Sequence, residues 1–589
     1  MIRRGVIGAL FLVPTATLGL QQDARTARST LGTASLAGKI VTGDTTPVPV
    51  RRATITLLNG LGLVLTAVTD EHGAFAFTGL PAGRFTLSAT KGGFLPAKYG
   101  ARLPAGIGVP IVIADGQHTT GVTLTLQHGS ALSGAVVDES GQPIPNVKVS
   151  VFKRMVSDRT GESTLQAAPF ASSSATDDRG RYRIWGLEAG QYAVSAISPV
   201  APSSIAAQEI LQITDADIQH ALRLLGPGGA VSPNPSRPGP DAPVVTRVTY
   251  APVYFPSAAT PAEASLISLG SNEDRDGINI QLRMIPAARI EGLTTGPDGA
   301  PMAGVEVLSL DPGPLPLGYL ASAYRSTTSD RSGNYTLSGV APGTYELIAT
   351  ARTNPLQWAL GTVAVSGRDV NVPLVMTPAL TLSGRLMFDG SSPRPRNLDS
   401  LMPLIRRMTI GGPQTFARTV TPEGRFTFSI IAGRFRTESL LRDASVTGGW
   451  MLKSVVIDGA DVTDVVFDIT KSVDDAVITF TDRISELSGQ IQEGAGAPAS
   501  GYALLVFSAD KRFWLPQSRR TVATRPETNG QYLIRNLPAG DYLMIALTDV
   551  EPSQLNDPAF LAQMAAQSPI RITLGEGEKR VQYVKVGGG

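Results

Sequence analysis

The sequence of 589 residues contains no cysteine. This absence excludes disulfide bonds, thiolate nucleophiles, cysteine-ligated zinc, iron–sulfur clusters and anchoring through an N-terminal thioether. Histidine is scarce as well, with His72, His118, His128 and His220 as the full set. His118 and His128 flank a predicted strand, which places them too far apart to share a metal ion. We therefore expect no metal site, no cofactor and no catalytic residue.

Charge of either sign is also sparse. Charged residues make up 17% of the chain, and 51 Lys and Arg stand against 49 Asp and Glu, for a net charge of +2. No run of five basic residues occurs. Such a balance gives no field that would attract nucleic acid, which we exclude as a partner. Hydrophobic residues reach 42%, which is enough apolar material for folded cores.

Long hydrophobic runs are missing after the N-terminus, so no later segment could cross a membrane as a helix. The N-terminus has a positive head at residues 1–4 and an uncharged, mostly apolar stretch from Gly5 to Leu20. This order is typical of an export signal. We interpret residues 1–20 as a signal peptide and 21–34 as a linker, with an uncleaved membrane anchor as the alternative. Export predicts a periplasmic, cell-surface or extracellular location, with no membrane span once the signal is removed.

Against these absences stands one short pattern that recurs five times. It reads acidic residue, two residues, Gly, one residue, aromatic, with Thr replacing the acid in the fourth copy. The copies begin at Asp70, Asp177, Asp330, Thr421 and Glu527. An acid three residues before Gly suits a tight turn in which Gly adopts a positive φ. Each turn offers two or three oxygens, whereas Ca²⁺ needs six or more, so we interpret the acids as turn residues.

A second Gly-x-aromatic step follows each copy and opens an alternating strand. Phe85, Leu87 and Ala89 fall on one face of the first such strand, and this period of two predicts half-buried strands. Each unit also begins with an aliphatic-x-Gly step, at Gly38, Gly134, Gly292, Gly384 and Gly489. The predicted units are residues 35–127, 128–285, 286–377, 378–472 and 473–589. We expect small antiparallel Greek-key β-sandwiches, joined as an extended rod.

Two short helices are expected as decorations on this all-β chain. Thr214-Asp-Ala-Asp217 resembles a capping box ahead of an amphipathic run, inside an insertion near residues 200–249 of the second unit. The insertion is otherwise rich in Pro and Gly and predicts a loop or linker. The second helix is predicted within the last unit, near residues 558–566.

Two units carry the motifs of a known module. The second has Gly134, Asp138, Gly141 and Pro143 before its turn, and the third has Gly292, Pro301, Gly333 and Tyr335. This pattern resembles the carboxypeptidase regulatory-like domain, and the other units resemble it in part. The resemblance implies a transthyretin-like (prealbumin-like) sandwich of the carbohydrate-binding-like group, common as an accessory module of secreted bacterial proteins. A zinc carboxypeptidase would need His-x-x-Glu, which no histidine here provides, so the resemblance is to the module without the enzyme.

Ligand contact is then expected at aromatic side chains. Trp185 should lie on the outward face of its strand beside Arg181 and Arg183, where it could stack on a sugar ring or anchor a protein. Trp514 and Tyr254 lie in loop-like stretches and are the other candidates. The alternative for all three aromatic residues is packing against a neighbouring unit.

These observations favour an exported, non-enzymatic binding or scaffold protein of the cell envelope. The expected partner is polysaccharide or another envelope protein, in a carbohydrate-binding or adhesive role. One alternative is an accessory subunit that presents substrate to a separate envelope enzyme or transporter. Another is a hydrolase that uses carboxylates alone, with its site at a domain junction.

Overall fold

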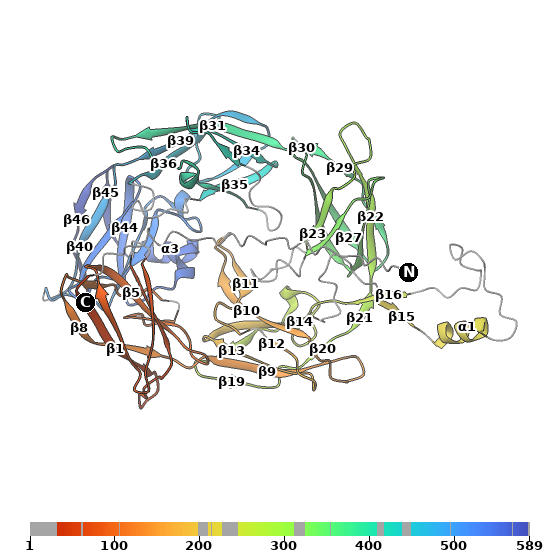
Figure 1. Ribbon diagram of the computed structural model, residues 1–589, viewed down its shortest axis with the longest axis horizontal. Coiled ribbons are helices and arrows are strands. Elements are labelled where there is room, and N and C mark those ends of the chain that lie inside the picture. The colour runs from red at the N-terminus through yellow and green to blue at the C-terminus, as the bar shows by residue number, and fades with distance from the viewer. Residues whose placement is uncertain are drawn as a thin grey trace, which may run out of the picture.

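The computed structural model describes residues 32–586 except 60–62, 198–209, 226–245, 311–323, 409–417, 439–448 and seven single positions (105, 159, 173, 214, 354, 495 and 568). The predicted signal peptide lies outside the described residues, as do most of the linker and much of the insertion. Strands dominate the fold, and its α-helices are short. The expected all-β array of small sandwiches is therefore confirmed (Figure 1). Within the described ranges no helix has the length and apolar character needed to cross a membrane.

Units one and two each consist of two facing sheets. In unit one, the first sheet has the order β4 (Ala74–Leu80), β1 (Ala34–Thr42), β8 (His118–Leu126), and the second has β3 (Val64–Val68), β2 (Thr54–Asn59), β5 (Gly83–Thr90), with β6 (Ala97–Lys98) and β7 (Ile111–Ile113) both paired to β5. In unit two, the first sheet has β13 (Arg181–Leu187), β9 (Ser130–Val137), β19 (Asp274–Arg275) and β20 (Ile280–Gln281), and the second has β11 (Ser163–Ala167), β10 (Lys148–Val156), β14 (Gly190–Ile197), β17 (Val253–Tyr254), β12 (Ser174–Ala175) and β18 (Ile267–Leu269).

A small sheet links the second and third units, and the predicted first helix is confirmed beside it. The sheet has the order β15 (Ile210–Gln212), β16 (Thr246–Tyr250), β21 (Met284–Pro286), and α1 (Asp215–Leu225) lies between β15 and β16 in the chain. Ile218 and Leu222 on α1 are exposed, and the helix extends away from the sandwiches (Figure 1). A short 3-10 helix, η1 (Pro261–Glu263), precedes β18.

Units three and four repeat the two-sheet plan. Unit three has β25 (Asn334–Val340), β22 (Ala288–Thr295), β28 (Val370–Asn371) and β29 (Leu374–Val375) facing β24 (Tyr324–Thr328), β23 (Glu306–Leu310), β26 (Gly343–Ala351), β27 (Gln357–Val365) and β30 (Thr377–Pro378). Unit four has β33 (Arg418–Val420), β34 (Arg425–Ile430), β31 (Leu380–Asp389), β39 (Val473–Thr481), β36 (Met451–Ile457) and β37 (Ala460–Asp461) facing β32 (Leu404–Arg407), β35 (Gly433–Glu438) and β38 (Val466–Ile469), with the 3-10 helix η2 (Asp399–Leu401).

Unit five carries the second predicted helix, which is also confirmed. Its sheets are β43 (Gln531–Arg535), β40 (Glu486–Glu493), β46 (Lys579–Val581) and β47 (Val584–Val586), facing β42 (Thr521–Thr524), β41 (Ala503–Ser508), β44 (Gly540–Leu547) and β45 (Ile570–Leu574). The helices are η3 (Lys511–Phe513), η4 (Pro552–Asn556) and α3 (Pro558–Ala565). The Asp557 side chain caps α3 by accepting a hydrogen bond from the Ala559 amide, and Leu561 and Met564 bury its inner face.

Each unit has one or two parallel pairings, and all of them involve its first strand. The first strand pairs with the last strands in the same direction, as β1 does with β8 and β9 does with β20. A glycine of the first strand stands at this contact. In unit two, a Cβ atom on Gly134 would lie 2.1 Å from the carbonyl oxygen of Ile278, so only glycine fits there. The Tyr182 hydroxyl donates a hydrogen bond of 2.6 Å to the same carbonyl.

The same arrangement of a glycine, a carbonyl oxygen and an aromatic residue recurs in every unit, and we call it the node. The other close approaches, each with a Cβ-to-oxygen distance of 1.8–2.1 Å, are Gly38 to Val122, Gly292 to Val372, Gly384 to Ala476 and Gly489 to Gln582. Tyr335 and Tyr532 donate to these carbonyls in units three and five, while units one and four have Phe75 and Phe426 at the equivalent turn position. The aliphatic-x-Gly step seen in the sequence therefore marks where the closing strand crosses the opening one.

The repeated turn has the geometry that its residues predict. Its glycines all have a positive φ, between +70° and +84°, at Gly73, Gly180, Gly333, Gly424 and Gly530. In unit three, Asp330 Oδ1 accepts hydrogen bonds from the amides of Ser332 and Asn334, at 2.8 and 2.9 Å. These bonds lower the pKa of Asp330. The carboxylate thus closes its own turn.

Clusters of buried residues fill the space between the facing sheets, and unit five has a second cluster under α3. The fourth cluster includes Val473, Ile478 and Phe480. The sequence placed these residues in the fifth unit, but β39 pairs with β31 and β36 and so closes the fourth sandwich. The boundary between the last two units therefore lies after Thr481 instead of at 472.

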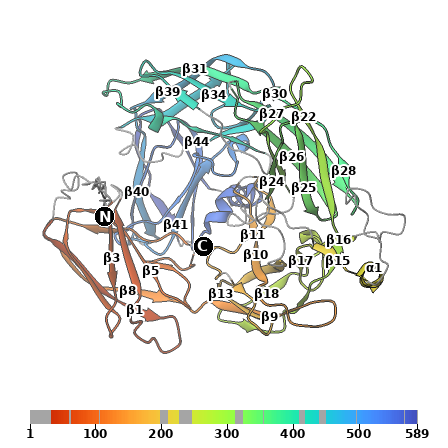
Figure 2. The same cartoon turned by 45° about the vertical axis from the view of Figure 1, so that its right-hand side comes forward.

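The expected extended rod is wrong, because the units follow one another around a ring (Figure 1, Figure 2). Unit five returns to unit one, where Arg84 pairs with Glu527 at 2.9 Å. It also meets the loop after β10 of unit two, since a Cβ on Gly161 would lie 3.2 Å from the Asn556 carbonyl oxygen. Contacts between neighbours bend the chain, and no local sequence pattern encodes them.

Gly292→Ala tests the node in unit three. A methyl group 2.0 Å from the Val372 oxygen must push the closing strand away, so we expect a loss of roughly 3 kcal/mol in the free energy of unfolding. Gly343→Ala in the same unit is the control, because its added Cβ would meet only ordinary contacts of 3.4 Å and more. Calorimetric scans of the full chain measure the unfolding temperatures of the two variants. Equal unfolding temperatures for the two variants would contradict the assignment.

The tyrosines of the node predict a fall in stability at alkaline pH. Burial raises the pKa of Tyr182, Tyr335 and Tyr532 above the ordinary value of about 10. Below pH 10 the hydroxyl is protonated in both the folded and the unfolded chain, so stability stays level. Above pH 10 only the unfolded chain ionises, and the free energy of unfolding should fall by about 1.4 kcal/mol per pH unit for each tyrosine.

Denaturant titrations between pH 8 and pH 11.5 measure this slope. Tyr335→Phe should be less stable than the wild type at pH 8, because the Val372 carbonyl loses its hydroxyl donor. The variant should also lose less stability between the two pH values. A wild-type chain whose stability stays unchanged up to pH 11.5 would refute the buried hydroxyl–carbonyl bonds.

Candidate functional site

The outward face of β13 carries three of the predicted binding residues. Trp185 is 40% exposed, and Arg181 and Arg183 are exposed on the same face of the strand. Ala131 lies opposite Trp185 on β9, and Asp274 lies beyond it on β19. Ala131 is itself buried while Trp185 remains 40% exposed, so this face has a partly exposed aromatic surface edged by charge.

Charged neighbours hold this face in place. Arg183 pairs with Asp274 at 3.1 Å, a pair that is about half exposed. The Trp185 amide donates to Ser172 Oγ at 3.0 Å, and the Ser172 amide donates back to the Trp185 carbonyl at 2.9 Å. The backbone under the indole is thus fixed while the ring itself remains accessible.

Trp514 and Tyr254 do not join this face. Trp514 is 6% exposed and packs in the cluster under α3, where its Nε1 donates to the Ser508 carbonyl at 2.7 Å. Its ring therefore offers no surface to a ligand, and it packs within its own unit instead of against a neighbouring one. Tyr254 is half-buried on β17, with its ring centre 6.2 Å from that of Phe152. The predicted residues thus separate into one exposed group and two isolated positions.

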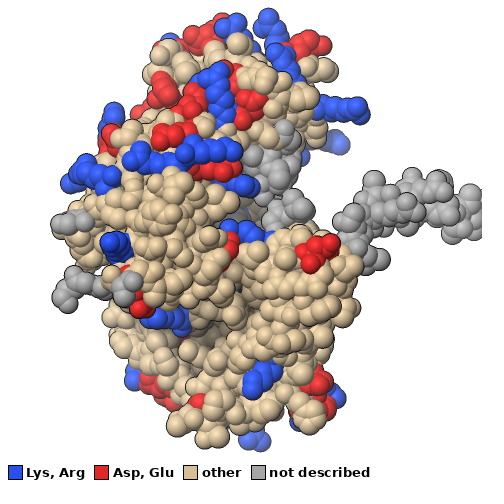
Figure 3. Space-filling view, turned by 90° about the vertical axis from the view of Figure 1, so that its left-hand side faces the viewer, with Lys and Arg blue, Asp and Glu red and all other residues tan. Residues whose placement is uncertain are grey.

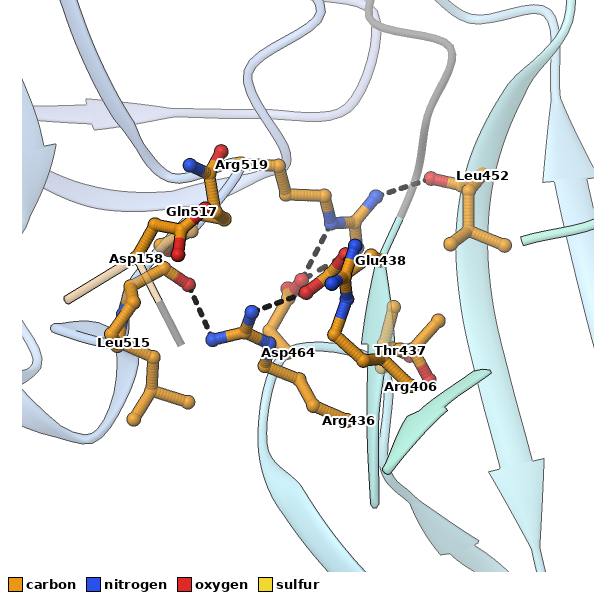
Figure 4. Close-up of a pocket in the computed structure, with 13 residues that line it drawn as sticks. Asp158, Arg406, Arg436, Thr437, Glu438, Leu452, Asp464, Leu515, Gln517 and Arg519 are labelled. Carbon is orange, nitrogen blue, oxygen red and sulfur yellow. Dashed lines mark hydrogen bonds and ion pairs between the residues drawn. The ribbon is translucent and has the colours of Figure 1, made fainter. Parts of the chain in front are cut away.

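A polar cavity of about 240 Å³ lies where units two, four and five meet (Figure 4). Asp158 comes from unit two, at the loop that follows β10. Unit four contributes Arg406 from β32, Arg436 and Glu438 from β35, and Asp464 from the loop before β38. Unit five supplies the segment between η3 and β42. The full lining is Asp158, Arg406, Arg436, Thr437, Glu438, Leu452, Thr463, Asp464, Leu515, Pro516, Gln517, Ser518 and Arg519.

Strand alternation presents one arginine cluster to this cavity. Arg406 and Arg436 are directly opposite in the pairing of β32 with β35, and Glu438 lies two residues along the same face as Arg436. Arg406 Nε donates to Glu438 at 2.8 Å, and Arg436 Nη2 donates to the other oxygen of the same carboxylate. Arg436 Nη1 donates to the Pro516 carbonyl of unit five at 2.7 Å. Two guanidinium groups therefore share a single carboxylate.

A second cluster joins units four and five beside the first. Asp464 accepts hydrogen bonds from Arg519 at 2.6 Å and from Arg520 at 2.7 Å. Burial by itself would raise the pKa of Asp464, but the two arginines hold it below the ordinary value. Glu438 and Asp464 are thus each held by two arginines, and Asp464 stays ionised at neutral pH. This is the wrong state for the proton donor that a carboxylate-only hydrolase at this junction would need.

The outer border of units four and five is charged as well. Charged side chains of both signs gather over the upper part of this side of the molecule, while the lower part is mostly uncharged (Figure 3). Lys453 pairs with Asp389 at 2.6 Å and with Glu576 of unit five at 2.9 Å. Arg483 also pairs with Asp389, at 2.9 Å. Ion pairs therefore hold this border both around the cavity and at the surface.

The sequence interpretation missed the cavity entirely. The alternation Arg434-x-Arg436-x-Glu438 and the doublets Arg406-Arg407 and Arg519-Arg520 are visible in the sequence. Strand alternation alone could have placed Arg436 and Glu438 on one face. The pairing of β35 with β38 inside unit four brings Asp464 near them, whereas Asp158 comes from unit two, which no local pattern predicts. Among the residues that the structure describes, no group of three or more His, Asp and Glu could hold a metal ion.

Comparison with known proteins identifies a family for part of the chain. Residues 35–127, 131–205 and 289–377 match the family model of the carboxypeptidase regulatory-like domain. No curated protein matches the sequence.

Similar solved structures include three pilins. A streptococcal ancillary pilin is 9% identical over 59% of this chain and 99% of its own, with a TM-score of 0.20. The minor pilin of Streptococcus agalactiae is 13% identical over 43% and 97%, with a TM-score of 0.21. The major pilin subunit of Bacillus cereus is 10% identical over 59% and 99%, with a TM-score of 0.14. Likenesses this low carry no weight for function.

Asp464→Asn tests how the last two units are joined. The substitution leaves Arg519 and Arg520 largely buried without a counter-ion. We therefore expect the free energy of unfolding of units four and five to fall by about 3 kcal/mol. Asp468→Asn is the matched control, because that carboxylate is exposed and lies 3.7 Å from Arg434. The control should change stability by less than about 0.5 kcal/mol. Calorimetry of the full chain distinguishes the two, and a D464N scan that overlays the control would contradict the proposed join.

Proposed function

Units one and three and much of unit two are carboxypeptidase regulatory-like domains, and from this premise we propose that the chain is an exported, non-enzymatic scaffold of the cell envelope. We further propose that it contacts polysaccharide or a partner protein through the outward face of β13. The exposed Trp185, with Arg181 and Arg183 beside it, is the observation that carries the second part.

The arrangement of the units supports a scaffold. Unit five contacts units one, two and four, so displacing one unit would break contacts with several others. Glu438 and Asp464 at the cavity are each engaged by arginines, which suits a structural junction better than acid–base chemistry. A stiff ring of sandwiches holds the outward faces of its sheets in fixed positions, as a scaffold requires.

The β13 face supports a binding role for chemical reasons. An indole ring presents a flat apolar surface, and sugar rings carry apolar C–H faces that can cover it. Arg181 is exposed on the same face of β13 as the ring, and its N–H groups can donate to hydroxyl or carboxylate oxygens. An uncovered aromatic residue close to arginine also has the composition of an anchor at a protein interface.

Trp185→Ala is the test of this face. On a glycan array, wild-type protein should bind at least one glycan, and the variant should bind it at least tenfold more weakly, because the stacking surface is gone. Tyr583→Ala is the matched control, since that aromatic side chain is 56% exposed but belongs to unit five. The control should bind as the wild type does.

Two results would count against the carbohydrate part. If no glycan binds, and wild-type protein instead co-purifies from the envelope with an enzyme or transporter, this result supports the alternative of an accessory subunit. If glycans bind equally well to W185A, the site lies elsewhere on the molecule. Hydrolysis of polysaccharide by the pure chain would overturn the non-enzymatic assignment.

A further inference from the structure

We propose that the cavity between units two, four and five binds a small ligand through an oxyanion, a carboxylate or phosphate group held by Arg406 and Arg436. This site is separate from the β13 face, so it stands or falls independently of the function proposed above. The inference rests on the charge of the cavity, on hydrogen-bond donors that the protein leaves unused, and on the cavity's size.

Three arginines and three carboxylates line the cavity, and the arginine side of this junction could accept an anion. Arg406, Arg436, Arg519 and Arg520 converge there, and the carboxylates paired with them are those of Glu438 and Asp464. Asp158 also lines the cavity but is exposed to solvent. Like charges directly opposite on paired strands destabilise a sheet, as Arg406 and Arg436 do here. Glu438 already supplies one counter-charge to both guanidinium groups, and a bound anion would supply a second.

Unused donors mark where the anion would lie. The side chain of Arg436 is 5% exposed, yet its Nε has no hydrogen-bond partner among the residues that the structure describes. A buried N–H group of a charged side chain is costly to leave unpaired. Within the described part of the chain, Arg406 forms its hydrogen bond through Nε and leaves both Nη atoms for another partner. Figure 4 shows both guanidinium groups at the cavity.

Arg519 provides an internal contrast. Its Nε and Nη2 donate to Asp464, Nη1 donates to the Leu452 carbonyl, and Nη2 also donates to the Lys453 carbonyl at 3.2 Å. Its donors are therefore used in joining the two units. The planar fork of an arginine matches the two oxygens of a carboxylate or phosphate, and Arg406 and Arg436 are the residues with this capacity to spare.

The size of the cavity limits the ligand to one small unit. The cavity has a volume of about 240 Å³. Inorganic phosphate or one acidic monosaccharide fits this space, and a polymer could enter only by an end residue. Leu452, Leu515 and Pro516 supply an apolar wall beside the arginines. The shared recognition chemistry is thus an oxyanion on a compact molecule.

Isothermal titration of the full chain with three probes tests the proposal. The probes are sodium glucuronate, inorganic phosphate and uncharged glucose, each in chloride buffer at constant ionic strength. We expect heat of binding with glucuronate, with phosphate or with both, and none with glucose. Binding of glucuronate alone identifies an acidic sugar as the source of the oxyanion, and binding of phosphate alone identifies free phosphate.

Arg406→Gln should weaken binding of the anion at least tenfold, because it removes the guanidinium fork from the cavity. Arg434→Gln is the matched control, since Arg434 precedes Arg436 by two residues on β35 but its side chain is 68% exposed and does not line the cavity. The R434Q variant should bind the anion with the same affinity as the wild type. Arg406→Lys keeps the charge without the planar fork and should fall between the two. This variant also serves if R406Q unfolds, which a calorimetric scan reveals.

Absence of heat from both anions would overturn the proposal. Equal affinity in R406Q and the wild type would overturn it too, because binding would then occur elsewhere. Binding of glucose as tight as that of glucuronate would show that the oxyanion is not what the cavity recognises, with the same consequence. Loss of glycan binding in W185A would not alter any of these results, since Trp185 lies on β13 and does not line the cavity.

Discussion

The fold depends on one close contact that each unit repeats. A glycine on the opening strand lets the closing strand pass with its carbonyl oxygen about 2 Å from where a Cβ atom would be. This approach fixes the parallel pairing that closes the sandwich, and in three units a tyrosine hydroxyl then satisfies the carbonyl that the contact buries. Glycine, carbonyl and tyrosine act together, because the hydroxyl reaches its acceptor only where the strands meet this closely.

The chain then uses a different kind of interaction between units. Inside a sandwich, apolar side chains and backbone hydrogen bonds dominate, whereas the border of units four and five is held by arginines and carboxylates. A charged border is costly to desolvate and depends on exact partners, so it favours one relative placement over others. Such a border can fix the angle at which successive units meet. It also leaves polar cavities where the geometry of the pairs does not fill the space.

Sequence patterns predicted the repeated elements well for a physical reason. The turn acid, its glycine three residues later and the alternation after Gly-x-aromatic are local features, and local backbone preferences decide them. Asp330 and Gly333 show this, because the carboxylate closes the turn and the glycine has the expected positive φ. Trp185 followed from the same alternation. Trp514 did not, since burial of a loop residue depends on the helix that covers it.

The amino-acid sequence by itself determined the identity of the elements: five sandwiches, their turns, their opening glycines and two short helices. Tertiary structure alone decided how those sandwiches meet. It placed β39 in the fourth unit, returned the fifth unit to the first, and brought Asp158, Arg436 and Asp464 around one cavity. The physical reason is the separation in sequence between the residues that interact. Turns and strands are set by residues a few positions apart, whereas the cavity joins side chains from three units that meet only after the chain has closed on itself.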